Sequence, residues 1–383
     1  MKNRYAQQLE QLRNKGRLRT LHPLERRQFH LNLSSNDYLG VGANLELHEE
    51  FYDGRCQSTM ANYKLAASSS RLLTGDSHIA HDLEAKIAVA YGSETALFYN
   101  SGYHANIGIL PALFGKNDLI LSDKLNHASI HDGFRLSRAQ CKRYNHADYE
   151  QLRTLLIKYR KQYDQVVIVS ESVFSMDGDV ADIGKLVNLK KEFDTMLYID
   201  EAHGVGLYGR TGLGKVEAAG QLANVDLLVG TFGKAWASVG AFVCCSRVLR
   251  NYLINTSRSL IFTTGLAPVT LNWNRFVFEK SLLMNKERTH LQLLSQKLRT
   301  ALSGIGVTQA HHSNIISIPK GDDQTAVLQA AQMQKQGYLI LPIRPPAVPE
   351  GTARFRLSLC ADMEWDDLQK LANQLLKQNS ESH

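Results

Sequence analysis

Lys234, Asp200 and His203 are the residues whose types and spacing most clearly could do chemistry. Lys234 lies in the turn Thr231–Lys234, directly after an apolar run, and Asp200 and His203 follow another such run. A lysine with its stem against apolar packing can lose its proton and attack a carbonyl carbon. Pyridoxal phosphate (PLP) needs such a lysine for its aldehyde and a carboxylate for its pyridinium nitrogen. The three side chains therefore predict a PLP site, in which Asp200 meets the ring nitrogen and His203 the phenolic oxygen.

The apolar runs that precede these side chains recur at a regular spacing along the chain. The segments 165–170, 196–199 and 225–229 are apolar and rich in β-branched residues, as strands buried on both faces are. They recur about every thirty residues with helical crossovers such as 183–193, which predicts a parallel sheet with helices on both faces. Sheets of this kind bind ligands at the carboxyl ends of their strands. We therefore expect the polar residues after these strands, Ser175 among them, to meet in one crevice.

Two further segments could hold the phosphate and the ring of such a cofactor. Asn100–Asn106 follows the apolar run 96–99 and precedes the helical pattern 107–114. Amides at the start of a helix bind anions, although the same turn could be an ordinary helix cap. His127, in a loop after the run 119–122, has a flat ring that could stack on an aromatic cofactor or could simply be exposed. Both assignments stay open on the residues alone.

Arg354 and Arg356 alternate along a predicted strand and therefore point to one face of it. A guanidinium offers the two-pronged donor that a substrate carboxylate needs, and a pair of surface arginines is the alternative.

Two glycine-rich patterns are similar to nucleotide-binding motifs. Gly204–Gly209 has the GxGxxG spacing, and Gly209–Lys215 nearly forms a phosphate-binding loop. Yet no helical pattern opens at the first, and the second has Val216 in place of the Ser or Thr that would bind magnesium. We expect instead a mobile glycine loop beside a cofactor.

Length and composition indicate a soluble globular protein with more than one domain. The chain has 383 residues, 44% hydrophobic and 21% charged, and no apolar run near the roughly 20 residues of a membrane helix. The first thirty residues lack the apolar core of a secretory signal, so we expect a cytoplasmic protein, with an Arg-rich mitochondrial presequence as the alternative. The five cysteines have no CxxC spacing and are expected to be reduced thiols.

The formal net charge of +7 is moderate, and basic residues gather near the N-terminus. They lack the aromatic platform or helix-turn-helix pattern of a nucleic-acid site, so a solvated helix face or an anionic thioester carrier explains them better. The residues are Lys15, Arg17, Arg19, Arg26 and Arg27.

The elements near the two ends predict a separate α+β region. We expect three parts: an N-terminal helix and strand segment (1–45) that packs with the small domain, a large α/β domain (46–274) and a C-terminal α+β domain (275–383). The expected elements are a helix over 4–20, a strand over 31–33, a long helical stretch over 277–303, a strand over 314–318, a helix over 325–336, paired strands over 338–343 and 354–359, and a closing helix.

The chain resembles the α-oxoamine synthases, PLP enzymes of fold type I that condense an amino acid with an acyl thioester and release CO2. The likeness runs nearly end to end. It implies an α/β fold with a large, mainly parallel sheet domain of the seven-stranded type, a smaller α+β domain, and a homodimer with its active site at the subunit interface. The segments that carry it are Ser34–Gly40, Asn126–Ser129, Ser172–Asp179, Asp200–Gly204 and Thr231–Lys234.

The resemblance also assigns roles around the cofactor. Lys234 would form the Schiff base with PLP and later remove the α-proton of the amino acid. Asp200 would keep the pyridinium protonated, His203 would contact O3′, and His127 would stack on the ring. The other cofactor-binding residues that it implies are Gly102, Tyr103 and Thr231 at the phosphate, Thr264 from a partner subunit, and Ser175.

On the substrate side, the resemblance implies that Asn36 and Arg356 hold the amino-acid carboxylate, beside His127. Arg19 would face the acyl chain or its carrier, with Ala347 in the substrate pocket. The segments Ile343–Pro349 and Gly351–Arg354 are most similar to the biotin-pathway branch, which joins L-alanine to pimeloyl-CoA or a pimeloyl-acyl-carrier protein and makes 8-amino-7-oxononanoate.

The sequence departs from the family pattern at three places that the family brings near substrate, namely Ala66–Ser70, Ala235–Ala237 and Ala347. The alternatives are therefore a sister condensing enzyme, such as glycine C-acetyltransferase, 5-aminolevulinate synthase or a serine palmitoyltransferase-like enzyme, an aminotransferase on the same fold, or a binding protein that has lost catalysis.

Overall fold

The computed structural model describes residues 2–21, 29–54, 60–307 and 313–380. Of the residues discussed above, Arg26, Arg27 and Cys56 lie outside these ranges. The chain forms two compact units. We call them the small unit (Met1–Tyr38, Ser175–Asp179 and Thr289–His383) and the large unit (Leu39–Phe174 and Val180–Arg288).

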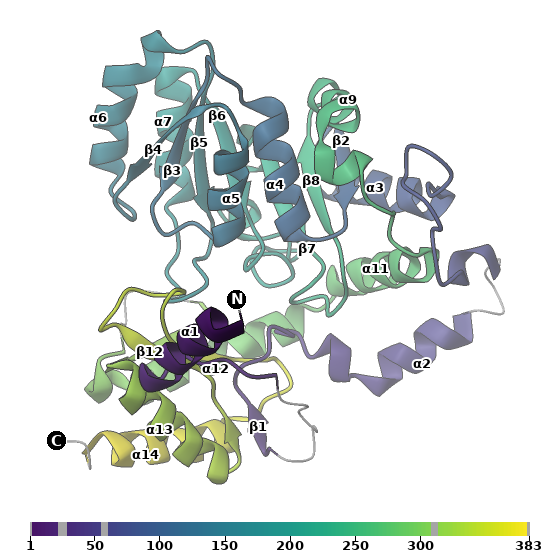
Figure 1. Cartoon of the computed structure of the whole chain (residues 1–383). Helices are drawn as coiled ribbons and strands as arrows, with labels where there is room; N and C mark the ends of the chain where they lie inside the picture. The colour runs from purple at the N-terminus through teal and green to yellow at the C-terminus, as the bar shows by residue number, and fades with distance from the viewer. Residues whose placement is uncertain (1, 22–28, 55–59, 308–312, 381–383) are drawn as a thin grey trace. The chain divides into compact units, whose positions relative to one another are not determined.

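A seven-stranded sheet forms the centre of the large unit (Figure 1). Its strands are β2 (Thr95–Tyr99), β3 (Leu119–Asp123), β4 (Gln140–Tyr144), β5 (Val166–Glu171), β6 (Met196–Asp200), β7 (Leu227–Thr231) and β8 (Ala241–Cys245). They lie in the order β2-β8-β7-β6-β5-β3-β4, and β8 alone runs antiparallel to its neighbours. The carboxyl ends of β5, β6 and β7 therefore lie side by side at one edge.

Helices cover both faces of this sheet. The helices of the large unit are α2 (Leu45–Asp53), α3 (His78–Tyr91), α4 (Gly102–Leu113), α5 (Ala128–Leu136), α6 (Tyr149–Tyr159), α7 (Ile183–Phe193), α8 (Lys215–Ala218), α9 (Arg247–Thr256), α10 (Arg258–Ile261) and α11 (Pro268–Ser281), with 3-10 turns η2 (Val41–Ala43), η4 (Met60–Tyr63), η5 (Arg160–Gln162) and η6 (Leu222–Asn224). Val169 and Val229 of the sheet join one buried cluster with Ile109 of α4 and Ile130 of α5. Phe242 of β8 meets Tyr91 of α3 instead, with ring centroids 5.4 Å apart.

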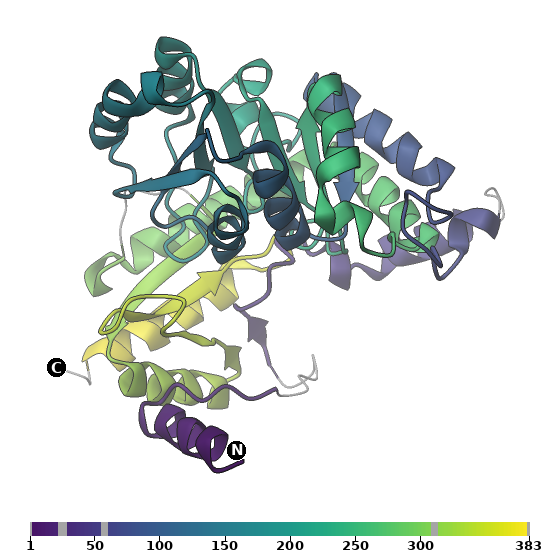
Figure 2. The same ribbon diagram turned by 45° about the horizontal axis from the view of Figure 1, so that its top comes forward.

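The small unit combines two small sheets with helices. Its elements are α1 (Lys2–Asn14), β1 (Leu31–Asn32), most of α12 (Asn285–Ala301), η7 (Ser303–Ile305), β9 (Ile315–Gly321), α13 (Asp323–Lys335), β10 (Tyr338–Leu339), β11 (Pro342–Ile343), β12 (Ala353–Ser358) and α14 (Trp365–Ser380). Strand β12 lies between β11 and β9, antiparallel to both, and β1 pairs with β10 in parallel. Helix α13 contacts β9, β10, β11 and β12 (Figures 1 and 2).

The predicted fold class, an α/β protein with a mainly parallel seven-stranded sheet, is confirmed. Three local predictions were wrong. The helical stretch 277–303 is two helices, α11 and α12, separated at 282–284. The strand predicted over 338–343 is divided between two sheets, because β10 pairs with β1 and β11 pairs with β12. The N-terminal helix is also shorter than the predicted 4–20, since α1 ends at Asn14 before Gly16, whose φ of 65° is left-handed.

The limits of the two units differ from the predicted boundaries at 45 and 274. The N-terminal segment belongs to the small unit as far as Tyr38, where β1 ties it to β10. The large unit extends to Arg288, because α11 packs on α3 and η4. Among the described residues, no helix combines the length and the apolar character needed to span a bilayer.

The contact between α4 and α5 depends on a glycine. A Cβ on Gly133 of α5 would lie 2.5 Å from the carbonyl oxygen of Asn106 in α4, so Gly133→Ala must push the two helices apart. We expect this substitution to cost about 1–3 kcal/mol of stability. Differential scanning calorimetry should then give a lower Tm. Gly54→Ala is the matched control, because its Cβ meets no atom of the described residues within 4 Å. Equal melting temperatures for both variants would contradict this packing.

Candidate active site

Lys234 lies in the turn that follows β7, close to a histidine. Thr231, the last residue of β7, donates its hydroxyl to the carbonyl of Gly240 (3.0 Å) and accepts the amide N–H of Gly233 (3.1 Å), which fixes the start of the turn. Lys234 Nζ lies 2.8 Å from His203 Nε2. A hydrogen bond at this distance needs one of the two nitrogens to be unprotonated, because an ammonium group has no lone pair. The structure thus brings together the lysine and the histidine predicted from two different strand ends.

Asp200, the last residue of β6, is buried, with 4% of its surface exposed. Its two carboxylate oxygens accept separate donors, the amide N–H of Ala202 (2.9 Å) and the side-chain amide of Asn106 (2.8 Å). Glu171 of β5 lies opposite Asp200 in the sheet. Burial and then the charge of Asp200 raise the pKa of Glu171 well above its ordinary value. This favours a neutral Glu171 beside Asp200.

His127 precedes α5 and caps it. Its Nδ1 accepts the backbone N–H of Ser129 (3.2 Å) and lies 2.7 Å from the Ser129 hydroxyl. The backbone N–H of His127 itself donates to the Glu171 carboxyl. Burial lowers the pKa of His127, and the charge of Lys234 lowers it further while that of Asp200 opposes the shift. These electrostatic interactions place His127 in the same cluster as Asp200 and Lys234.

The beginning of α4 faces the end of β7. Ser101 caps the helix by accepting the N–H of His104 (3.2 Å), and a Cβ on Gly102 would lie 3.8 Å from Cβ of Thr231. The helix N-terminus and the Thr231 side chain therefore lie next to each other, and together they suit a phosphate. The Tyr103 side chain points elsewhere and donates to Asp132 (2.6 Å), so Tyr103 offers its backbone amide rather than its ring.

The donor set of this cluster fits each polar group of PLP. A lysine amine is present for the aldehyde, a buried carboxylate for the ring nitrogen, an imidazole for the phenolic oxygen, and a helix N-terminus with a threonine for the phosphate.

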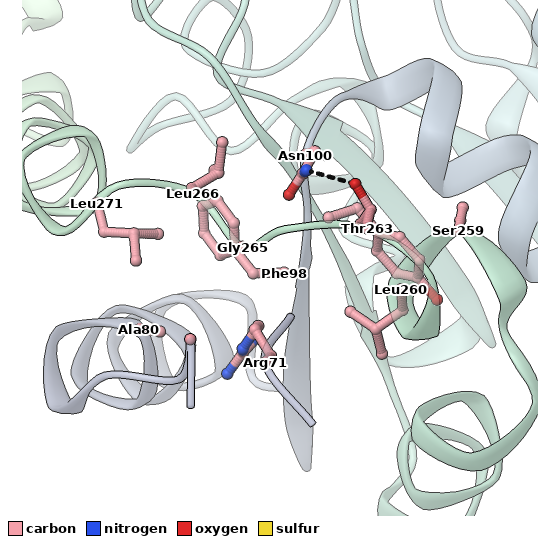
Figure 3. A pocket seen from close by; sticks show the side chains of 12 residues that line it. Arg71, Ala80, Phe98, Asn100, Ser259, Leu260, Thr263, Gly265, Leu266 and Leu271 are labelled. Carbon is pink, nitrogen blue, oxygen red and sulfur yellow. Dashed lines mark hydrogen bonds between the residues drawn. The ribbon is translucent and has the colours of Figure 1, made fainter. Parts of the chain in front are cut away.

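Thr264 lies in the segment after α10, with an exposed side chain. Asn100 donates its side-chain amide to the carbonyl of Thr264 (2.8 Å) and to the hydroxyl of Thr263 (3.2 Å). Figure 3 shows Asn100 and Thr263 at a pocket that Arg71 and Gly265 also line. The divergent segment Ala66–Ser70 packs here, since Ser69 accepts the N–H of Gly265 (2.9 Å). The role of Thr264 toward a partner subunit stays a prediction.

The glycine loop after β6 encloses a carboxyl group. Glu201 accepts the N–H of Val216 (2.6 Å) and the hydroxyl of Ser172. A Cβ on Gly204 or Gly214 would collide with this carboxyl. Burial raises the pKa of Glu201 to about 7. The close approach of the backbone to Glu201 explains these glycines without a nucleotide.

Trp236, in the divergent segment after Lys234, is fully buried and does not line the site. Its indole packs against the rings of Phe232, Phe242 and Phe278. This departure from the family pattern is therefore a packing residue behind the lysine.

In the small unit, Arg356 of β12 and Asn36 meet as the resemblance implied. Both terminal nitrogens of Arg356 lie 3.3 Å from Asn36 Oδ1, and the guanidinium also donates to the hydroxyls of Ser358 (2.8 Å) and Tyr38 (3.0 Å) and to the carbonyl of Ser175. All of these acceptors are neutral. Within the described ranges, no carboxylate comes within 4.0 Å of Arg356.

Arg354 differs from Arg356, although the two share one face of β12. Its guanidinium forms an ion pair with Asp177 and donates to the carbonyl of Thr352 (3.0 Å). The charge of Arg354 is thus already paired with a carboxylate of the protein. Arg356 is the better candidate for a substrate carboxylate.

Arg19 and Ala347 lie near one loop of the small unit, between β11 and β12. Arg19 donates to the carbonyl of Pro345 (3.2 Å), and Ala347 is exposed and donates its N–H to the carbonyl of Arg344 (3.1 Å). Burial and then the charge of Arg19 lower the pKa of Arg344. Arg17, by contrast, is paired with carboxylates and belongs to the structure of this unit.

Asn106 and Ser129 are site residues that the sequence did not single out. In the sequence, Asn106 stands only as the last residue of the predicted phosphate-binding turn Asn100–Asn106. The one available signal was a polar residue within an apolar helix, four positions after Gly102.

Comparisons with known proteins identify the family of this chain. Residues 30–375 match the family described as Aminotransferase class I and II. An 8-amino-7-oxononanoate synthase of Chlorobaculum parvum is 50% identical over 378 residues, covering 96% of each chain. A putative 8-amino-7-oxononanoate synthase of Haemophilus influenzae is 49% identical over 96% of this chain and 98% of its own.

Solved structures share the fold. A serine palmitoyltransferase variant of S. paucimobilis, with a bound PLP–myriocin aldimine, has a TM-score of 0.89 at 25% identity and covers 98% of this chain and 96% of its own. The 8-amino-7-oxononanoate synthase of Francisella tularensis has a TM-score of 0.77 at 26% identity, covering 92% and 98%. The resemblance drawn from the motifs is confirmed. This chain belongs to the Aminotransferase class I and II family and, within it, to the 8-amino-7-oxononanoate synthase family of α-oxoamine synthases.

Proposed function

We propose that this chain is a PLP-dependent acyltransferase that condenses L-alanine with a pimeloyl thioester to give 8-amino-7-oxononanoate, CO2 and a free thiol, a step of biotin biosynthesis. The observation that carries the proposal is the placement of Lys234 Nζ 2.8 Å from His203 in a site that contains the buried Asp200. The 50% identity to an 8-amino-7-oxononanoate synthase over nearly the whole chain selects the substrates.

Each residue of the site has a different chemical role in this reaction. PLP, when bound, supplies an electron sink for the α-carbon of the amino acid. Asp200 carries the negative charge that keeps a ring nitrogen protonated, and His203 offers Nε2 to the phenolic oxygen. Thr231 and the first amides of α4 would hold the phosphate.

Lys234 moves the proton. Its amine takes the α-proton of alanine, and a carbon–carbon bond then forms between that α-carbon and the thioester carbonyl while the thiol leaves. The carboxylate of alanine departs as CO2, and Lys234 returns a proton to the α-carbon. Lys234 Nζ and His203 Nε2 lie 2.8 Å apart, so one of these nitrogens can donate a hydrogen bond to the other.

Arg356 and Asn36 are our candidates for binding the alanine carboxylate. A guanidinium whose protein partners are all neutral oxygens still has its charge available for an anionic ligand. Asn36 Oδ1 and the Tyr38 hydroxyl hold the guanidinium plane in place. Arg19, near the exposed Ala347, is our candidate for contact with the acyl chain or its carrier, CoA or an acyl-carrier protein.

A homodimer forms part of the proposal, with Thr264 serving the phosphate site of the partner subunit. Exposed apolar side chains near this segment support it, since Phe262 is 70% exposed and Leu73 is 77% exposed. Burying such side chains against a second copy would be favourable. The cytoplasmic location expected from the sequence also stays a prediction.

A substrate panel tests the proposed reaction. Purified PLP-loaded protein should release thiol fastest with L-alanine and a pimeloyl thioester, and glycine or L-serine should be at least about tenfold poorer, a difference that one methyl or hydroxyl group can produce. Thiol release is read with a chromogenic disulfide. Preference for glycine with a short acyl-CoA, or for serine with a long one, would assign a sister activity. Amino-group transfer to α-keto acids without thiol release would indicate an aminotransferase.

Lys234→Ala should remove both the visible absorbance of bound PLP and turnover, lowering kcat/KM by at least about 10³-fold, because covalent attachment and proton transfer are lost together. Absorbance spectra and thiol release measure the two effects. Lys191→Ala, which changes an exposed lysine of α7, is the control and should match the wild type. A Lys234→Ala protein with normal colour and turnover would overturn the assignment.

Arg356→Gln should raise KM for L-alanine by about 10- to 100-fold, the effect of losing about 1.5–3 kcal/mol of charge-assisted hydrogen bonding, and should leave KM for the thioester nearly unchanged. Steady-state kinetics with each substrate varied in turn provide the measurement. Arg354→Gln changes the same residue type on the same face of β12, but this arginine is already paired with Asp177. An equal rise in alanine KM for the Arg354 variant would show that Arg356 has no special role.

A further inference from the structure

We propose that Asn106 is a positioning residue that holds the Asp200 carboxylate and, through Ser129, fixes His127 as a neutral imidazole with its proton on Nε2. The inference depends on the proposed function only for the roles of Asp200 and His127. The hydrogen-bond network that supports it consists entirely of residues of the large unit.

Asn106 uses all the hydrogen-bonding capacity of its side-chain amide nitrogen. With 1% of its surface exposed, it donates Nδ2 to Asp200 Oδ2 (2.8 Å) and to Ser129 Oγ (2.8 Å). Its Oδ1 accepts the hydroxyl of Tyr198, on the same strand as Asp200. An ionised carboxylate can only accept hydrogen bonds, so the nitrogen of Asn106 must face Asp200. This one constraint fixes the directions of the three bonds that Asn106 makes.

The network continues from Ser129 to His127. Because Ser129 Oγ accepts from Asn106, its hydroxyl proton can go to His127 Nδ1, 2.7 Å away. The backbone N–H of Ser129 points to the same nitrogen at 3.2 Å. Two donors thus converge on Nδ1, which must keep its lone pair. The single proton of a neutral ring is then on Nε2.

Protonating Nδ1 would set an N–H group against two donors. The other charged groups that act on His127 are Asp200 and Asp132, which favour the imidazolium, and Lys234, which opposes it together with burial. The balance lowers the pKa of His127, in agreement with the hydrogen-bond directions. His127 therefore presents an N–H donor at Nε2 and adds no positive charge of its own to the site.

The same network joins three elements around the carboxylate. Asn106 comes from α4, Ser129 and His127 from the start of α5, and Tyr198 and Asp200 from β6. The close contact of α4 and α5 is what lets the Asn106 side chain reach across to Ser129. Without Asn106, buried groups on both partners would lose a hydrogen bond, and Asp200 and His127 would no longer be held in one arrangement.

The test uses histidine-selective ¹⁵N labelling of the full-length protein without PLP, with the His127 signals assigned by their loss in His127→Gln. We expect wild-type His127 to be the Nε2–H tautomer. Ser129→Ala removes the hydroxyl donor, and Asn106→Asp lets that hydroxyl turn to the introduced carboxylate. Both should raise the pKa of His127, by about one unit, and mix its tautomers. PLP should bind both variants several-fold more weakly in fluorescence titrations.

Asn272→Asp is the matched control, since Asn272 is a buried asparagine of α11 whose Oδ1 accepts from Arg275 (3.1 Å), and it should leave His127 unchanged. An Nδ1–H tautomer in the wild type would overturn the proposal. So would unaltered His127 signals and titration in both Ser129→Ala and Asn106→Asp. Because the ¹⁵N readout of His127 needs neither substrate nor cofactor, failure there would leave the proposed reaction standing. Failure of the reaction would equally leave the tautomer assignment standing.

Discussion

The burial of the Asp200 carboxylate is the constraint around which the large unit is organised. A buried carboxylate is costly unless its oxygens accept hydrogen bonds and no second negative charge lies beside it. The structure meets the first condition with the N–H of Ala202 and the amide of Asn106, one for each oxygen. It meets the second because burial raises the pKa of the adjacent Glu171 and so favours its neutral form. A carboxylate kept ionised in this way is a suitable partner for a protonated ring nitrogen.

The topology of the sheet explains how the other groups come to the same place. Strands β5, β6 and β7 are neighbours and parallel, so residues that follow them in sequence meet at one edge. His203 and Lys234 come from adjacent strand ends and meet at 2.8 Å. Helix α4 adds its N-terminus through Gly102 and its second turn through Asn106. One helix thus serves both the phosphate region and the carboxylate.

Much of this arrangement could be predicted from the sequence, because apolar runs that end in polar residues carry a local signal. The partnership of Lys234 with the β6 loop belongs to this kind, whereas Asn36 and Arg356 were brought together only by the resemblance to the family. The role of Asn106 could not be predicted, since its partners are far away in the chain and are brought close only by the packing of α4 on α5 and β6. The division of 338–343 between two sheets depends in the same way on pairing with β1, a distant segment. The glycines around Glu201 matched nucleotide motifs because sequence spacing does not show which group a backbone approaches.

Covalent labelling tests the central claim most directly. Another half-buried lysine of the large unit is Lys215, and burial lowers its pKa to about 8, so lysine reactivity alone does not single out Lys234. The PLP-loaded protein can be reduced with borohydride and digested, and the peptides can be sequenced by mass spectrometry. The account predicts a phosphopyridoxyl group on Lys234 in near-stoichiometric yield. A label found mainly on Lys215, or spread over surface lysines, would contradict it.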